Sequence, residues 1–328
     1  MTYYLFKLRF LAPVHFGDSV SAVSLSTSQM TFCADRLFSA LCQVAARRDP
    51  EGPAKLADMV RAGKLKFSDA FPWKEENLYL PRPCLEAKTI REGDASDRKI
   101  MKKVEYLPLK QYQAFLQSLN GGAPVDPKTL LVRFGQGTVV TRASVAEGED
   151  TVPYAVGQFT FDGNSGLYFF AGVEDAHEKD MLCDLIRQIG YGGIGGKVSS
   201  GYGNFTVEQV CPVDEMGDGQ AGVLESLDDP KADFWISLTA SLPQDEELDS
   251  VLDGALYQLI RRGGFVQTTG LTGPGKKREQ FFLKAGSTFH KTYRGDIFDV
   301  APAGCPHPVY RYAVPIFLGV NSTWMTMG

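Results

Sequence analysis

Residues 190–205 read GYGGIGGKVSSGYGNF, and this is the most informative stretch of the chain. Seven of its sixteen residues are glycine. Glycine adopts positive φ angles and lets another backbone approach closely, so a loop of this composition can direct several N–H groups at one anion. Lys197, Ser199 and Ser200 add side-chain donors to the same stretch. The segment therefore predicts a phosphate-binding loop.

The elements on either side of this loop exclude the two common nucleotide-binding motifs. Apolar residues at helical spacing precede the loop at 181–189, and alternating apolar residues follow it at 205–210. A Walker A or dinucleotide-binding motif has the opposite order of strand, loop and helix. Val198 also stands where a Walker A motif requires Ser or Thr, and Tyr191 where it requires glycine.

Each half of the chain begins with a predicted strand that is followed by a predicted helix. Residues 3–10 and 234–242 alternate apolar and polar side chains, as half-buried strands do. Apolar residues at helical spacing follow at 37–45 and 246–262. This order favours an α+β fold of two ferredoxin-like (RRM-like, βαββαβ) halves, with helices on one face of each antiparallel sheet and the other face free.

The predicted first helix has clear signals at both ends. Thr31 is the expected N-cap, and Asp35 lies in the first turn, where the helix dipole favours an anion. Arg47 and Arg48 suit the C-terminal end for the same electrostatic reason.

The length of 328 residues predicts two domains, because one hydrophobic core usually serves fewer residues. Residues 214–230 are acidic and contain glycine, and we expect them to link an N-terminal domain, 1–230, to a C-terminal domain, 231–328. The first domain is too long for one ferredoxin-like unit. Its surplus, about 78–153, is rich in proline, glycine and charge, and predicts an inserted hairpin or thumb arm.

Composition excludes several classes of protein. The net charge is −5, so a nucleic-acid site has to be a local basic groove. The six cysteines form no Cys-x-x-Cys pair and the four histidines no His-x-x-x-His pair, so we expect no metal and no cofactor. We find no long apolar run and no signal peptide, and therefore expect a cytoplasmic protein without a membrane partner.

The helix, the loop GIGGKVSSGYG (193–203) and the strand together resemble the glycine-rich loop of the RAMP superfamily of CRISPR proteins. Further segments, in the same order as in the family, narrow the resemblance to the fourth subunit of type III-A (Csm) effector complexes. Among them are PVHFG (13–17), FPW (71–73), LPRP (80–83), VTR (140–142), GDIFDV (295–300) and HPVYRY (307–312). One departure is Ala34-Asp35-Arg36, where the family has Ser-Asp-Thr.

This resemblance implies a non-catalytic RNA-binding subunit in antiviral defence. Its partners would be the guide RNA (crRNA), held by its 5′ handle, the target RNA near that handle, the large polymerase-like Cas subunit and the backbone Csm subunit. The family's thumb hairpin would lie within residues 78–153. The candidate RNA-binding residues are the loop positions and three side chains elsewhere: Gly193, Gly195, Gly196, Lys197, Ser199, Ser200, Gly201, Tyr202, Gly203, His15, Arg36 and Arg142.

Each candidate also has a purely structural interpretation. The glycine loop could be only a tight turn, and His15 could be a packed, hydrogen-bonded histidine. Arg36 and Arg142 could be ordinary surface charges, although arginine both pairs with phosphate and stacks on bases. Tyr202 is a candidate for stacking on a base.

Two other functions compete with guide binding. A metal-independent guide-processing endoribonuclease would need a histidine as general acid or base, and His15 is the candidate for that role. A structural cap would bind protein rather than RNA, and replacing Lys197 would then leave RNA affinity unchanged.

Overall fold

The computed structural model describes residues 1–17, 25–86, 95–144, 152–217, 221–266, 268 and 275–321. Its first elements are β1 (Thr2–Phe10), α1 (Ala34–Arg48), α2 (Gly52–Arg61), β2 (Leu65–Phe67), β3 (Phe71–Lys74), β4 (Asn77–Pro81), α3 (Ala95–Met101), β5 (Tyr106–Pro108), α4 (Leu109–Leu119), α5 (Pro127–Leu130), β6 (Gly135–Ser144) and β7 (Val152–Phe161). The middle of the chain forms β8 (Ser165–Val173), α6 (Ala176–Gly192), η1 (Val198–Ser200), β9 (Phe205–Pro212), η2 (Val213–Glu215) and α7 (Ala221–Leu224). The last elements are β10 (Phe234–Ser237), α8 (Leu248–Leu252), β11 (Leu259–Arg262), β12 (Gln280–Leu283), β13 (Thr288–Phe289), β14 (Ile297–Asp299), β15 (Tyr310–Tyr312) and β16 (Phe317–Val320).

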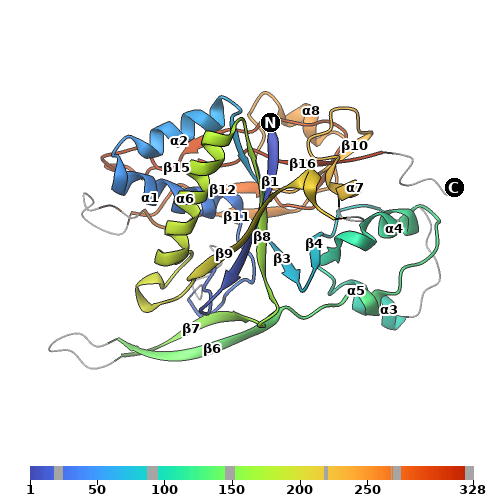
Figure 1. The fold of residues 1–328 in the computed structure, drawn as a ribbon, viewed down its shortest axis with the longest axis horizontal. Coiled ribbons are helices and arrows are strands. Elements are labelled where there is room, and N and C mark those ends of the chain that lie inside the picture. The colour runs from blue at the N-terminus through green and yellow to red at the C-terminus, as the bar shows by residue number, and fades with distance from the viewer. Residues whose placement is uncertain are drawn as a thin grey trace.

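The central sheet has the strand order β5-β4-β3-β8-β1-β9, and β2 also pairs with β8. All its pairs are antiparallel. Helix α1 follows β1, and α6 connects β8 to β9 (Figure 1). The predicted mixture of helices with antiparallel sheets is thus confirmed, as are the expected strand at the N-terminus and the helix and strand on either side of the glycine loop.

Both faces of the central sheet are covered. Phe6 and Leu8 of β1 pack into the same core as helices α1, α2 and α6. Leu5 points to the opposite face and joins a second core with Ile236 and Leu318 from the C-terminal half. The expectation of a free sheet face is therefore wrong, because the C-terminal half buries that face.

The first helix is capped by a residue far from it in the sequence. Helix α1 begins at Ala34, and Cys33 at its N-cap makes no side-chain hydrogen bond. The amide of Ala34 donates instead to the carboxylate of Asp69, at 2.8 Å. Thr31, the expected cap, is hydrogen-bonded to Tyr106, so that prediction is wrong.

Two buried carboxylates join the halves of the chain. Asp69 also accepts a hydrogen bond from the amide of Ala240, at 3.1 Å. Asp35, in the first turn of α1, accepts two hydrogen bonds from Arg262 of β11, at 2.6 and 3.0 Å. Burial raises the pKa of the Asp35 carboxyl group, but the Arg262 guanidinium outweighs it and leaves that pKa below its usual value.

The C-terminal half departs from the predicted strand and long helix. The expected helix over 246–262 is wrong, because α8 ends at Leu252 and residues 259–262 form β11. Gly254, at φ +67°, turns the chain after the helix. Strand β11 pairs with β12, whose residues lie 18 to 24 positions further along the chain, and periodicity within one segment cannot reveal such a partner.

The predicted arm, 78–153, contains two different structures. Strands β4 and β5 extend the central sheet, and Tyr112 of α4 is buried in the second core. Strands β6 and β7 form a long hairpin that extends away from the sheet (Figure 1). Residues 87–94 and 145–151 of this arm lie outside the described residues.

The predicted linker, 214–230, is packed against both halves rather than extended. Leu224 and Leu227 are buried in the second core. Asp228 accepts hydrogen bonds from Lys66 at 2.6 Å and from the amide of Phe317 at 2.8 Å. Its central residues, 218–220, lie outside the described part.

We predict that Asp69→Ala lowers the free energy of unfolding by about 2 to 6 kcal/mol, because two buried amides lose their acceptor at about 1–3 kcal/mol each. Asp69→Asn retains an acceptor oxygen and should cost much less. Urea denaturation of both variants measures the difference.

We also predict that Asp69 makes the stability of the protein depend on pH. Burial raises the pKa of Asp69 to about 7, so the folded protein holds this proton more tightly than the unfolded chain does. The contribution to stability is therefore fully present below about pH 4 and is lost as the pH rises to about 7. Asp69→Asn should lack this part of the dependence, and an identical pH profile in the two proteins would contradict the assignment.

Candidate RNA interface

The glycine-rich loop connects α6 to β9 and turns at four glycines. Gly193, Gly195, Gly201 and Gly203 have φ angles of +87°, +104°, +82° and +77°. Residues other than glycine rarely adopt such backbone angles, so the turns require glycine at these positions.

Close packing explains some of these glycines. A Cβ atom on Gly203 would lie 2.1 Å from the carbonyl oxygen of Ile194, and one on Gly196 would lie 2.6 Å from the His15 ring. A Cβ atom on Gly201 would meet open space. Gly203 and Gly196 therefore let the loop fold onto itself and onto His15.

The backbone amides of the loop are not all available to a phosphate. Seven donate within the chain, those of Gly193, Ile194, Gly196, Ser200, Gly201, Tyr202 and Gly203. The expectation that the loop directs several N–H groups at one anion can therefore apply only to amides that have no acceptor within the chain. The amides of Gly195, Lys197, Val198 and Ser199 donate to no other part of the chain that the structure describes.

Cationic and hydroxyl groups surround these four amides. Lys197 has a φ angle of +60°, and its ammonium group lies 4.7 Å from the centre of the Tyr154 ring. Ser199 and Ser200 are exposed. The structure thus brings these three predicted side chains together at the outer turn of the loop.

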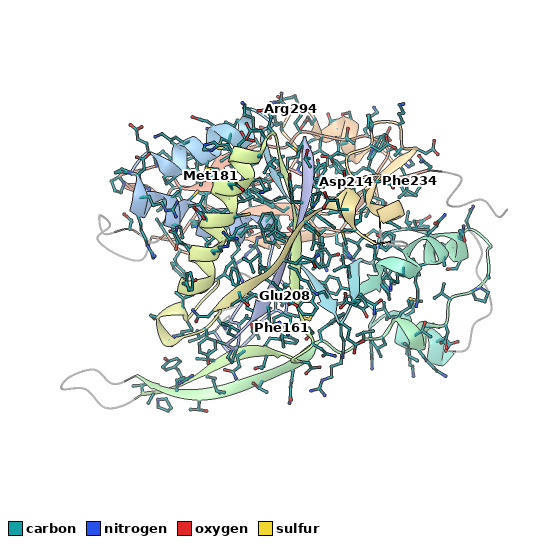
Figure 2. The ribbon with its side chains drawn as sticks, viewed as in Figure 1. Phe161, Met181, Glu208, Asp214, Phe234 and Arg294 are labelled. Carbon is teal, nitrogen blue, oxygen red and sulfur yellow. The ribbon has the colours of Figure 1, made fainter. Side chains whose placement is uncertain are left out.

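The hairpin β6–β7 packs against the same loop. Arg142 of β6 lies opposite Tyr154 of β7 and donates a hydrogen bond to the hydroxyl group of Tyr202, at 3.3 Å. Phe161, at the end of β7, stacks on Phe10 of β1 with ring centres 5.1 Å apart. Figure 2 shows Phe161 where the hairpin meets the sheet. Arg142 is exposed, so it adds a cation beside the loop.

Tyr202 cannot serve as a stacking platform in this conformation. Its side chain is 3% exposed, and its hydroxyl group donates to Gln158 at 2.7 Å. The proposed stacking role is therefore wrong, because Tyr202 joins the loop to the hairpin instead. Tyr191, which is not among the residues predicted from the sequence, is 84% exposed at the end of α6. Exposure depends on the tertiary fold, so the sequence contains no signal that separates these two tyrosines.

His15 is held beneath the loop. Its side chain is 5% exposed, and Nδ1 is 2.7 Å from the carbonyl oxygen of Gly157. Burial lowers the pKa of His15, and the charges of Arg36 and Lys197 act in the same direction. The imidazole is thus a neutral group that packs the loop against the hairpin.

Arg36 belongs to a groove next to the loop. Its guanidinium group lies 5.3 Å from the centre of the Phe16 ring and donates to the carbonyl oxygen of Gly17, at 3.0 Å. Burial lowers the pKa of Arg36 to about 10, and nearby Arg262 adds to the effect. The groove has a volume of about 1040 Å³ and lies between α1, the segment after β4, and β11.

Comparison with known proteins identifies the family. Residues 33–206 match the sequence model of the RAMP superfamily, and residues 230–320 match that of the CRISPR Csm4 C-terminal domain. The CRISPR system Cms protein Csm4 of Mycobacterium tuberculosis (strain CDC 1551 / Oshkosh) is 33% identical over 311 residues, which cover 93% of this chain and 94% of that protein. The chain belongs to the Csm4 family.

Other members of the Csm4 family agree with this assignment. The protein of Streptococcus thermophilus is 30% identical, and the match covers 97% of this chain and 98% of that one. Among solved structures, a chain of a Csm3–Csm4 subcomplex in the type III-A CRISPR-Cas interference complex has a TM-score of 0.62 at 18% identity, with 98% of this chain and 100% of that chain covered. A chain of a Csm1–Csm4 cassette in complex with cA4 has a TM-score of 0.60 at 19% identity and full coverage of both chains. These structures share the fold.

The described residues provide neither a membrane span nor a metal site. None of their helices combines the length and apolar character that a membrane span requires. They contain no group of three or more His, Cys, Asp or Glu side chains arranged to hold a metal ion. Their cysteines are free thiols.

We predict that Gly203→Ala and Gly201→Ala differ strongly in this Csm4-family loop. In both variants an alanine has to adopt the left-handed φ angle of the native glycine, at a cost of about 1–2 kcal/mol. Only Gly203→Ala also drives a Cβ atom into the Ile194 carbonyl oxygen, so it should lower stability well beyond that amount. Thermal unfolding checks the pair, and equal losses would contradict a packing role for Gly203.

Proposed function

We propose that this chain is a non-catalytic RNA-binding subunit of a type III-A CRISPR effector complex and that it holds the 5′ handle of the guide RNA. The observation that carries the proposal is the outer turn of the loop. The amides of Lys197, Val198 and Ser199 are consecutive, donate to no described group, and lie next to two exposed serine hydroxyls. Clustered amides of this kind bind phosphate oxygens.

The charges around this turn suit a nucleic-acid backbone. Lys197 and the exposed Arg142 provide two cations within reach of the Tyr154 ring and the Tyr202 hydroxyl group. A phosphate at the three amides would gain charge-assisted hydrogen bonds from Lys197. The candidate glycines from Gly193 to Gly203 and His15 would act by shaping the loop. Arg36 would act through its place in the neighbouring groove.

The partners follow from family membership. Solved structures contain Csm4 proteins in a Csm1–Csm4 cassette and in a Csm3–Csm4 subcomplex. By analogy, this chain would contact a large polymerase-like Cas subunit and a backbone Csm subunit in the cytoplasm. The hairpin β6–β7 would be the thumb that lies near the target RNA beside the handle.

The strand order of the central sheet supports the first of the two proposed halves. The strands β2, β8, β1 and β9, with helices after β1 and β8, have the order of one ferredoxin-like unit. We infer a second, reduced unit in the C-terminal half and a boundary near residue 230, with domains 1–230 and 231–328. Residues of both units pack together in the second core.

The geometry of His15 disfavours the nuclease alternative. A general acid or base needs access to the RNA and a pKa near the working pH. Gly196 covers the ring, the side chain is buried, and burial lowers the pKa of His15. We therefore propose that the chain holds its RNA without cutting it.

Lys197→Ala should weaken binding of a guide RNA with its 5′ handle and lower the slope of log affinity against log salt by about 0.7, the value for one phosphate on a single strand. Exposed Lys231→Ala is the matched control and should change neither quantity. Filter binding at several salt concentrations, with the large subunit present and absent, provides the test.

The outcomes separate the competing functions. Loss of affinity on Lys197→Ala with intact RNA supports guide binding. Cleavage that persists in a chelator and requires His15 would establish the nuclease instead. Equal affinity for RNAs with and without the handle, with the large subunit present, would leave a structural cap.

Tyr191→Leu should weaken binding of the same RNA by about 1–3 kcal/mol if this exposed ring stacks on a base. Tyr191→Phe keeps the ring and should bind as the original protein does. Equal affinities for the leucine and phenylalanine variants would exclude Tyr191 from the interface. Fluorescence anisotropy of a labelled guide RNA measures both variants.

A further inference from the structure

Helices α3 and α5 lie in a segment with a local excess of positive charge. Residues 95–133, which contain both helices, have seven Lys and Arg residues against three Asp and Glu, on a chain of net charge −5. Four lysines on α3, on the turn after it and on α5 are exposed, and we call them the α3–α5 face: Lys99, Lys102, Lys103 and Lys128. A basic patch on an acidic chain is the electrostatic signature of a site for a polyanion.

The packing of the two helices turns these lysines toward solvent. Helix α3 packs against α5, and Figure 1 shows the pair at one end of the molecule, apart from α1, α2 and α6. Leu130 of α5 and Val104, just after α3, are buried in the second core, and Met101 packs against that core. The apolar side chains thus occupy the inner side of the pair, and the exposed lysines lie on its outer side.

The lysines of the α3–α5 face are not neutralised within the described part of the chain. The ion pairs among the described residues include none of the four. Asp126 is the acidic residue nearest to Lys128 in the sequence, and its carboxylate accepts a hydrogen bond from the Lys128 amide, at 2.9 Å, as the N-cap of α5. The ammonium groups are therefore available to an external anion.

Hydrogen bonds anchor both ends of this segment to the strands of the central sheet. Arg82, just after β4, donates to the carbonyl oxygen of Met101 at the end of α3, at 2.6 Å. Lys74 of β3 donates to the carbonyl oxygen of Arg133, just after α5, at 2.7 Å. The lysines consequently stand on an anchored backbone, and little backbone freedom is lost when a ligand binds.

The composition of the α3–α5 face suits the outside of a double helix. Among the described residues of 95–133 no aromatic side chain is exposed, because Tyr112 and Phe115 are buried and Tyr106 is partly buried. Sites for single strands use exposed rings that stack on bases, and this face has none. The cores of protein interfaces are depleted in lysine. A duplex presents phosphates on its outside, and lysine pairs with phosphate as a hydrated point charge.

We propose that the α3–α5 face binds the phosphate backbone of a nucleic-acid double helix without reading its base sequence. Lys99, Lys102, Lys103 and Lys128 contact phosphates, and such contacts position a duplex without carrying sequence information. The face lies on other elements than the glycine-rich loop, so this proposal does not depend on guide binding. Duplex DNA and duplex RNA share the phosphate chemistry, and the experiment distinguishes them.

The test measures the affinity of the full chain for a short labelled DNA duplex by fluorescence anisotropy at several salt concentrations. The original protein should bind duplexes of unrelated sequence equally, with a Kd of about 10⁻⁴ to 10⁻⁶ M. The double variant Lys103→Gln, Lys128→Gln should weaken binding and lower the slope of log affinity against log salt by about 1.8, or 0.9 for each phosphate contact. The matched double variant Lys231→Gln, Lys291→Gln removes the same charge at exposed positions elsewhere and should change neither quantity.

Two further measurements identify the ligand and the site. An RNA duplex and a single strand of the same sequence replace the DNA duplex in the same titration. Binding of both duplexes supports recognition of the shared backbone, and binding of one duplex identifies which source the face accepts. Acetylation of lysines with and without the duplex, read by mass spectrometry, should show protection of the α3–α5 face and no protection of Lys231.

Three results would overturn the proposal. In the first, the double variant Lys103→Gln, Lys128→Gln binds the duplex like the original protein. In the second, a single strand binds more tightly than the duplex and depends on the same lysines. In the third, the variant keeps its duplex affinity but no longer assembles with the large or the backbone subunit, which would make this face a protein interface.

Guide binding is tested separately from this face. Lys197→Ala should leave the affinity for the duplex unchanged, and the double variant Lys103→Gln, Lys128→Gln should leave the affinity for the guide RNA unchanged. Failure of one proposal therefore leaves the other standing. Circular dichroism of each variant distinguishes a loss of binding from a failure to fold.

Discussion

The ion pair between Asp35 and Arg262 determines how the two halves of the chain meet. It joins the first turn of α1 to β11 and is almost completely buried. Loss of one partner would leave an uncompensated charge in the interior, which typically costs about 3–5 kcal/mol. Arg311 is also buried and donates to the carbonyl oxygens of Arg262 and Gly263, which holds the end of β11 in place. The groove exists because β11 is held at this distance from α1.

The glycine-rich loop contains two sets of residues, one that packs the loop and one whose amides have no described acceptor. Most of its amides, and the close approaches at Gly196 and Gly203, hold the loop on itself and on His15. That internal bonding leaves the amides of Lys197, Val198 and Ser199 without an acceptor among the described residues. A preorganised turn loses little conformational freedom when it binds a phosphate, which favours affinity.

The loop and the hairpin form one rigid surface. Val14 exchanges two backbone hydrogen bonds with Phe159 of β7, at 2.8 and 2.9 Å. The His15 ring is hydrogen-bonded to the carbonyl oxygen of Gly157, two residues earlier in the same strand. Tyr202 and Gln158 add a side-chain link from the loop. These links hold the loop and the base of the hairpin together.

The elements and motifs that could be predicted from the sequence are those whose signals lie within about fifteen consecutive residues. These are strand β1, helices α1 and α6, the loop's dependence on glycine, and the ordered segments that identified the family. The tertiary structure alone decided the features that depend on distant partners. Asp69 caps α1 from 35 residues away, β11 forms because β12 pairs with it, and the C-terminal half buries a sheet face that appeared free. Tyr202 and Tyr191 lie in one glycine-rich stretch, yet the first is buried beside Gln158 and the second is 84% exposed, since exposure is set by the whole fold rather than by neighbouring residues.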